Sequence, residues 1–166
     1  MIDNQRLVEE IGGQFGEKVH RFEENFGILG FSTAPEDLLS VVAFLKEHPV
    51  LKFNFLTDIT GVHFPDNTGA EFCSVCLMHS WENRIRVRIK VFVPKENPVV
   101  PSLTPLFDAA NWMERETFDF YGILYSGHPN LKRILNMDDM DYFPMRKEYA
   151  LEDPTRRDKI DDLFGR

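Results

Sequence analysis

The chain has 166 residues, of which 43% are hydrophobic and 28% charged, a composition typical of one globular domain with at most a short extension. Its formal net charge of −8 disfavours nonspecific binding to nucleic acid or to an anionic membrane surface. Two cysteines exclude a disulfide framework and an iron–sulfur cluster held by four cysteines of this chain. The N-terminus is polar, and the longest apolar window, residues 38–45, is much shorter than the roughly 20 residues of a spanning helix. We therefore expect neither a signal peptide nor a membrane span.

The first part of the chain predicts two helices around a short strand. Apolar residues recur at helical spacing over residues 7–15, although two central glycines weaken the helix. Residues 28–31, framed by glycines, indicate a short strand. Residues 33–36 (Thr-Ala-Pro-Glu) are typical of a capping box, and they predict a second helix that ends at His48.

The middle of the chain predicts three strands. Residues 53–59 form the first, followed by a loop over residues 60–69 that is rich in turn residues. Residues 71–79 and 84–93 form a hairpin. The last strand alternates strictly, because an apolar residue follows each member of a basic series. That series is Arg84, Arg86, Arg88 and Lys90.

The remaining chain predicts one helix and an arm. The helix begins at Thr104, with Pro105 in its first position, and ends at Tyr121, where Gly122 can adopt the left-handed conformation. Beyond it hydrophobic periodicity is lost, and we expect an extended arm that closes with a short helix capped at residues 153–154.

These elements predict an α+β fold. Residues 1–125 are expected to form a two-layer sandwich of helices on a mostly antiparallel (mixed) sheet, and residues 126–166 an extended C-terminal arm. The arm has too few apolar residues to fold alone, so we expect it to lie on a partner.

Cys73, Cys76 and His79 stand at the spacing of metal ligands. In a strand, however, residues an odd number apart point to opposite faces, so Cys76 should face away from the other two. The surrounding segment also lacks the turn residues of a zinc knuckle. The favoured interpretation is that both cysteines are buried, small apolar residues.

Two charged features admit a functional and a structural interpretation. The basic strand face could follow phosphates, but no aromatic stacking platform interleaves it, so a solvated or partner-facing surface is favoured. Glu114 and Asp119 could form an acid–base pair, but Arg115 and Asp119 are spaced for a helical ion pair. No nucleophile, base and orienting group stand at readable spacing, so the residues alone predict no active site.

A long segment then resembles a known family. Residues 114–122 (Glu-Arg-Glu-Thr-Phe-Asp-Phe-Tyr-Gly) and 128–135 (His-Pro-Asn-Leu-Lys-Arg-Ile-Leu) closely resemble the signature of the C-type (30-kilodalton-type) subunit of bacterial NADH:quinone oxidoreductase, respiratory complex I. Residues 53–61 and 144–149 resemble two further blocks of that family, so the likeness spans most of the chain. Departures are mild, with Tyr121, Met145 and Glu148 standing where Phe, Leu and Asp are usual.

The resemblance implies a non-redox structural and assembly subunit of a proton-translocating NADH:quinone oxidoreductase. Such subunits lie in the peripheral arm, on the cytoplasmic side of the inner (plasma) membrane. They carry no flavin, iron–sulfur cluster or quinone, so no catalytic, cofactor-binding or metal residue is expected here. The implied partners are the D-type subunit, along which the C-terminal extension runs, and the B-type subunit, which completes the quinone site.

The resemblance also implies which residues dock on the partner. They are Glu114, Arg115, Glu116, Phe118, Asp119, Phe120, Tyr121, Gly122, His128, Pro129, Arg133, Arg146 and Lys147. The helix charges would form interfacial hydrogen bonds, the aromatic residues would supply apolar area, and the arm cations would pair with acidic partner groups.

Three alternatives remain open. The helix charges could instead only brace the chain's own helix. The chain could be the equivalent subunit of a complex I-related membrane hydrogenase. It could also be a free-standing binding module that uses the basic strand face.

Overall fold

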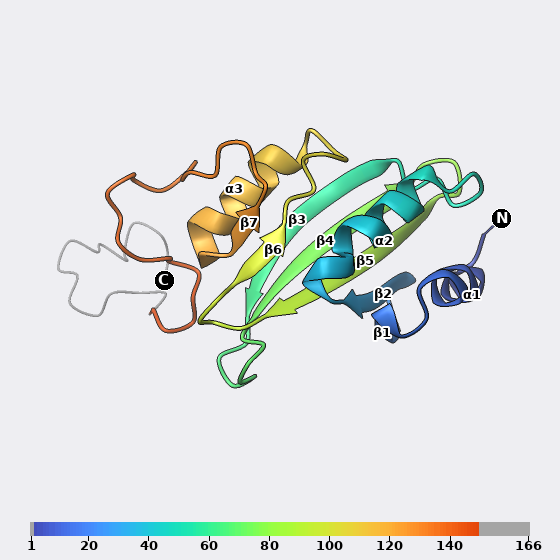
Figure 1. The fold of residues 1–166 in the computed structure, drawn as a ribbon, viewed down its shortest axis with the longest axis horizontal. Coiled ribbons are helices and arrows are strands. Elements are labelled where there is room, and N and C mark those ends of the chain that lie inside the picture. The colour runs from blue at the N-terminus through green and yellow to red at the C-terminus, as the bar shows by residue number, and fades with distance from the viewer. Residues whose placement is uncertain (1, 150–166) are drawn as a thin grey trace, which may run out of the picture.

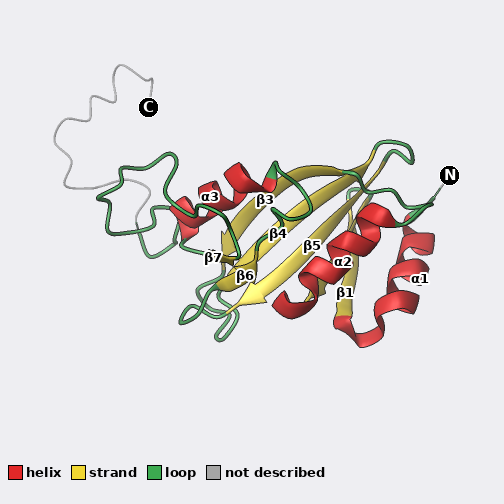
Figure 2. Cartoon of the chain, turned by 45° about the horizontal axis from the view of Figure 1, so that its top comes forward, coloured by secondary structure: helices red, strands yellow, loops and turns green. Residues whose placement is uncertain are grey.

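The computed structural model describes residues 2–149, and in it helices pack against one five-stranded sheet (Figures 1 and 2). The helices are α1 (Asn4–Phe15), α2 (Pro35–Glu47) and α3 (Ala110–Tyr121), with a 3-10 turn, η1 (Gly16–Lys18), after α1. The sheet strands are β1 (Val19–Asn25), β2 (Ile28–Thr33), β3 (Phe55–His63), β4 (Phe72–Ser80) and β5 (Ile85–Val93). A small second sheet joins β6 (Val99–Pro101) to β7 (Leu124–Ser126).

The main sheet is mixed but mostly antiparallel. Its strand order is β1-β2-β5-β4-β3, and only the central pair β2–β5 is parallel. Helices α1 and α2 lie over one face of the sheet, whereas α3 packs beside the edge strand β3 (Figures 1 and 2). The predicted α+β sandwich is therefore confirmed.

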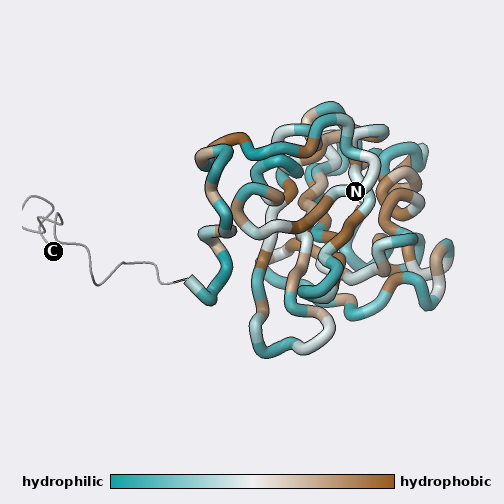
Figure 3. The backbone as a smooth tube through the Cα atoms, turned by 60° about the vertical axis from the view of Figure 1, so that its left-hand side comes forward, coloured by the Kyte–Doolittle hydropathy of each residue, from teal (hydrophilic) through white to brown (hydrophobic). Residues whose placement is uncertain are grey.

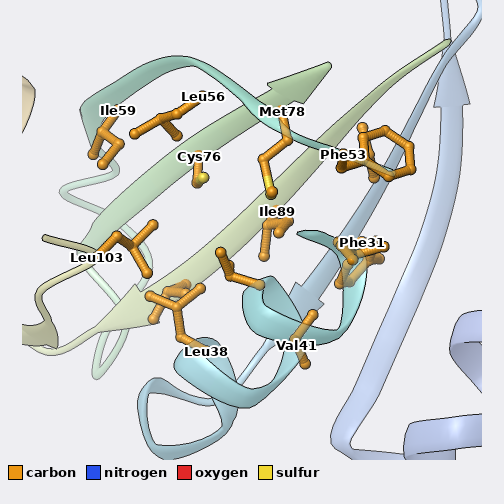
Figure 4. Packing of buried hydrophobic residues seen from close by; sticks show 14 of the residues in the cluster. Phe31, Leu38, Val41, Phe53, Leu56, Ile59, Cys76, Met78, Ile89 and Leu103 are labelled. Carbon is orange, nitrogen blue, oxygen red and sulfur yellow. The ribbon is translucent and has the colours of Figure 1, made fainter. Parts of the chain in front are cut away.

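The core lies between this sheet face and the helices. The alternation predicted for residues 84–93 is present in β5, where Val87 and Ile89 are buried while the basic residues face the other side. On β4, Cys76 and Met78 point to the same core, where α2 contributes Leu38 and its neighbours (Figure 4). Hydrophilic residues prevail along the arm, whereas hydrophobic residues concentrate in the strands and the helices (Figure 3).

Two predicted helix starts are wrong, because polar side chains find distant or irregular partners. Thr33 does not cap α2. Its hydroxyl donates to the carbonyl of Lys18, 2.9 Å away, and the N-cap residue is Ala34. Helix α3 begins at Ala110 rather than at Thr104, whose hydroxyl lies 2.7 Å from that of Ser102. The segment before α3 is a turn.

Two strands also differ from the prediction. β1 lacks a clear apolar pattern, so the sequence does not predict it as a strand. β3 runs to His63, well beyond residue 59, because its pairing with β4 continues to Phe72. Gly61, expected in a loop, is a buried strand residue, and Tyr121 covers it closely.

The described part of the arm, residues 127–149, contains turns but neither helix nor strand, and it loops around the C-terminal end of α3 (Figure 1). The division into residues 1–125 and 126–166 stays a prediction. The short helix expected after residue 153 lies outside the described residues. Among residues 2–149, none of the helices has the length and apolarity that crossing a bilayer requires.

Candidate functional site

The residues of the long signature meet where α3 ends and the arm begins, a region we call the helix–arm junction (residues 114–122 and 128–149). Gly122 ends α3 in the left-handed conformation (φ 74°), as predicted, and its N–H donates to Phe118 O at 2.8 Å. This cap turns the chain so that the arm can return along the helix.

Asp119 is the centre of the helix–arm junction. Its side chain is 0% exposed, and Oδ1 accepts a hydrogen bond from Arg133 Nη1 at 2.7 Å. Oδ2 accepts three more from consecutive arm amides, of Ile134 (3.0 Å), Leu135 (2.8 Å) and Asn136 (2.9 Å). One carboxylate therefore fixes the conformation of the arm.

These bonds determine the charge of Asp119. Burial by itself raises the pKa of this carboxyl, but the three backbone N–H donors and the Arg133 guanidinium favour the ionised form more strongly. The net effect holds the pKa of Asp119 well below its usual range. The carboxylate is thus ionised at neutral pH.

Arg133 connects Asp119 to the next loop of the arm. Its Nη2 donates to Met140 O (2.7 Å) and to Tyr142 O (2.9 Å), and its guanidinium lies 5.1 Å from the Phe143 ring centroid. The side chain is only 11% exposed. The prediction that Arg133 pairs with an acidic partner group is therefore wrong, because its acidic group is Asp119 of its own chain.

The expected helical pair of Arg115 with Asp119 does not form. Arg115 instead donates from Nε to Lys132 O and from Nη2 to Arg133 O, both at 3.1 Å. The helical spacing is a poor guide here because the arm offers both side chains better partners. Arg115 also fastens the arm to α3.

Arg146 holds the later part of the arm. Its Nε donates to Tyr121 O at 2.7 Å, and its guanidinium lies between the rings of Phe143 (4.6 Å) and Phe72 (4.8 Å). With 15% of its side chain exposed and Glu148 only 3.8 Å away, Arg146 has an internal role rather than the predicted pairing with a partner.

Glu114 fastens the opposite end of α3. It is 0% exposed, and its two oxygens accept from Ser102 Oγ and Leu103 N, both at 2.6 Å. Burial raises the pKa of Glu114 to about 7, although both hydrogen bonds act in the opposite direction. The expected interfacial role of Glu114 and Asp119 is therefore corrected: both carboxylates brace the chain's own helix.

The remaining signature residues differ in exposure. His128 forms the expected turn, with Nδ1 accepting from Asn130 N at 3.0 Å and Nε2 lying 3.1 Å from Asn111 O. Gly122 is buried. The half-buried members of the predicted docking set are Arg115, Phe118, Phe120, Tyr121, His128, Arg133 and Arg146, and the exposed ones are Glu116, Pro129 and Lys147.

Sequence reasoning missed the apolar surface of the arm. Large apolar side chains are exposed there, namely Leu135, Met137, Tyr142, Met145 and Tyr149. Their only sequence signal is that they interrupt a polar, aperiodic segment, which no periodicity rule detects. A cavity of about 230 Å3 adjoins them, bounded by Met145 from the arm, Glu116, Phe120 and Tyr121 from α3, and Asp58 from β3.

The two cysteines do not form a pair. Cys76 belongs to the core, whereas Cys73 lies on the other face of β4, as the strand geometry predicts. Both are buried, and burial raises the pKa of the Cys73 thiol to about 12 and that of Cys76 still further. Within residues 2–149, no group of three His, Cys, Asp or Glu side chains is arranged to hold a metal ion.

Solved structures similar to this chain come from two respiratory proteins. A trypsin-resistant fragment (1–134) of Nqo5 matches with a TM-score of 0.64 and 32% identity, covering 76% of this chain and 98% of that chain. A chain of an archaeal membrane-bound sulfane sulfur reductase matches with a TM-score of 0.75 but only 20% identity, over 89% of this chain and 85% of that chain. The second likeness shows a shared fold alone.

Sequence comparison gives relatives that this chain covers over most of their length. The second C-type subunit of the NADH-quinone oxidoreductase of Rhizobium meliloti is 43% identical over 84% of this chain and 75% of that protein. The C-type subunit of the Trichlorobacter lovleyi enzyme is 36% identical over 94% of this chain and 95% of that protein. The family model of the respiratory-chain NADH dehydrogenase 30 Kd subunit matches residues 31–155. This chain therefore belongs to the family of the 30-kDa, or C-type, subunit of NADH-quinone oxidoreductase, the respiratory complex I family.

Proposed function

We propose that the chain is a non-redox assembly subunit in the peripheral arm of a proton-translocating NADH:quinone oxidoreductase, on the cytoplasmic side of the inner (plasma) membrane. It docks on the D-type subunit, beside the B-type subunit, and supports electron transfer from NADH to quinone without taking part in it. Flavin, iron–sulfur clusters and quinone are bound by other subunits. The names of its relatives, subunits of NADH-quinone oxidoreductases, support this assignment.

The observation that carries the docking role is an apolar surface on an arm that is held in place. Leu135, Met137 and Met145 are 64%, 68% and 51% exposed, although Asp119 and Arg146 fix the backbone around them. Large apolar side chains that are preorganised on a surface are typical of interfaces, because binding then costs little conformational entropy. The carboxylate network of the helix–arm junction thus positions the docking surface instead of contacting the partner.

The buried thiols support the non-redox role. Cys73 and Cys76 point to opposite faces of β4 and both have raised pKa values, so they are poor thiolate ligands for a cluster. Glu114 and Asp119 are separately engaged in structural hydrogen bonds. We therefore assign no catalytic step and no cofactor to this chain.

The main alternative is the equivalent subunit of a related membrane complex with another electron donor. The fold is compatible with it, since it is shared with a sulfane sulfur reductase chain, but that likeness is only 20% in sequence. The relatives at 36–43% identity favour the NADH-linked complex.

Purification through a tag on this chain tests the proposal. The wild-type protein should bring down a stoichiometric D-type subunit, and the double variant Leu135→Asp/Met137→Asp should lose most of it. The matched control is Phe26→Asp, which introduces the same kind of charge at a fully exposed apolar side chain (103%) in the β1–β2 turn and should change nothing. Complexes that do form should keep their quinone reduction rate per complex. Full assembly of the double variant with a lost rate would instead indicate a direct catalytic role.

A further inference from the structure

The sheet face turned away from the helices carries two parallel rows of side chains that the proposed function does not use. Register places Cys73, Val75 and Leu77 of β4 beside Arg86, Arg88 and Lys90 of β5, with Val75 opposite Lys90 and Leu77 opposite Arg88. We call these two rows the open sheet face. The neighbouring odd-numbered residues of β5 and even-numbered residues of β4 point into the core.

The two rows differ in chemistry. Side chains directly opposite each other on neighbouring strands lie about 5 Å apart, and side chains along one strand repeat about every 7 Å. An apolar row therefore runs alongside a cationic row at a short, regular distance. Cys73 and Val75 are buried beneath longer neighbours, and Leu77 is half-buried.

The cationic row is not neutralised by the chain itself. Glu23 of β1 bonds Lys90, and its side chain lies across Gly30 to reach it. Within the described residues, neither Arg86 nor Arg88 has a carboxylate at ion-pair distance. These free guanidinium groups occur in a chain whose formal net charge is −8, so the open sheet face opposes the charge of the molecule.

One end of the open sheet face is aromatic. Trp81 is 60% exposed and Phe55 is 43% exposed, with their ring centroids 5.5 Å apart. His79, which stands opposite Phe55 in the sheet, lies 4.6 Å from the Trp81 ring. Exposed aromatic residues and arginines are the residue types enriched at protein–protein contacts.

We infer that the open sheet face is a second docking surface, which takes an acidic amphipathic helix of another subunit of the same complex. A helix is the element that covers a sheet face in layered folds. Its apolar stripe would lie over Leu77 and Trp81, and the carboxylates beside that stripe would pair with Arg86 and Arg88. The inference rests on the proposed membership in a complex, but it uses a face distant in sequence from the helix–arm junction.

Photo-crosslinking in the purified, assembled complex tests the inference. Trp81 is replaced by p-benzoylphenylalanine, an aromatic exchange at an exposed position. We expect a covalent link to an acidic helical segment of another subunit, identified by mass spectrometry. The double variant Arg86→Glu/Arg88→Glu should lose this link, whereas Arg6→Glu/Lys18→Glu, with the same charge change at exposed cations on the helical side, should keep it.

The outcomes separate this inference from the proposed function. If the chain is absent from the purified complex, the proposed function fails and the inference fails with it. If the chain is present but position 81 yields no link, or links to a second copy of the chain or to a basic segment, only the second docking surface is refuted.

Discussion

Arg133 Nη1 lies 2.7 Å from Asp119 Oδ1, in an ion pair whose side chains are 11% and 0% exposed. The pair joins the last turn of α3 to the arm across 14 residues of sequence. Because Asp119 also accepts three backbone N–H groups of the arm, the helix and the arm behave as one structural unit. The exposed apolar residues of the arm are therefore presented in a fixed conformation.

Replacing Asp119 should consequently destabilise the protein. Asp119→Asn removes the charge while leaving Arg133 buried, and breaking a buried pair in this way costs about 3 kcal/mol. Urea unfolding should show this decrease in the free energy of unfolding. The control is Asp139→Asn, an exposed arm carboxylate, which should stay within about 0.5 kcal/mol of wild type. A loss as small as that of the control would contradict the bracing role.

The same carboxylate should make stability depend on acid. Its pKa is lowered in the folded state, so its stabilisation is present above the unfolded value of about 4 and is lost as pH falls toward the folded value. The difference in unfolding free energy between wild type and Asp119→Asn should therefore be constant near neutrality and shrink below about pH 4. A difference that grew on acidification would reverse the assigned sign.

Gly122 is predicted to be essential for seating the arm. A Cβ atom there would lie 2.5 Å from Arg146 Nη2 and 2.6 Å from Phe143 Cε2, in a residue with φ 74°. Gly127 has a similar φ of 82° but nothing within 4 Å, so it offers a matched control. Both alanine variants strain the backbone by about 1 kcal/mol, but only Gly122→Ala also displaces the arm. Trypsin should cleave faster at Arg146 in that variant alone.

The elements with a regular pattern can be predicted from sequence. Alternation identifies β5, and helical spacing identifies α1 and α2, because burial on one face requires these periods. Gly122 is predictable as the end of α3 because its left-handed conformation suits glycine. The long signature identifies the family, although it does not show what its charges do.

The charge partners cannot be predicted in this way, because they depend on chain segments distant in sequence. Arg115 and Asp119 suit each other along a helix, yet each bonds the arm. Thr33 suits a capping box, yet it bonds a carbonyl 15 residues away. Local propensity is a weak guide where tertiary contacts offer a buried group more hydrogen bonds.

The contact between β3 and α3 makes Gly61 a further sensitive position. A Cβ atom on Gly61 would lie 2.5 Å from Tyr121 Cδ2 and 2.8 Å from Cγ, so the ring would have to move. Gly61→Ala should therefore lower the free energy of unfolding by about 1–3 kcal/mol, as overpacking does. Gly13→Ala, where nothing lies within 4 Å, serves as the control and should be neutral or stabilising.

A double variant decides whether the Tyr121 ring is the cause. In Gly61→Ala/Tyr121→Ala the clash is absent, so the combined loss should be smaller than the sum of the two single losses. Additive losses in urea unfolding would show that the strand itself, and not the contact with α3, resists the methyl group.

Glu114 should oppose stability at higher pH, in the opposite sense to Asp119. Its folded pKa is about 7, above the unfolded value of about 4.3, so the folded state binds a proton more strongly between these values. Stability should therefore fall as pH rises from about 4.5 to about 7, and the full loss should persist above that range. Cys76 and Tyr125 also face this carboxyl, but their pKa values are raised, so both stay neutral throughout the window.

Glu114→Gln removes the titration while keeping an oxygen that can accept from Ser102 or Leu103. In thermal or urea unfolding from about pH 4.5 to about pH 8, the variant should gain on wild type as pH rises, with the change centred between the two pKa values. Glu116→Gln, an exposed carboxyl on the same helix, should run parallel to wild type. A pH-independent offset for Glu114→Gln would mean that Glu114 is already ionised at the low end, and that its hydrogen bonds outweigh its burial.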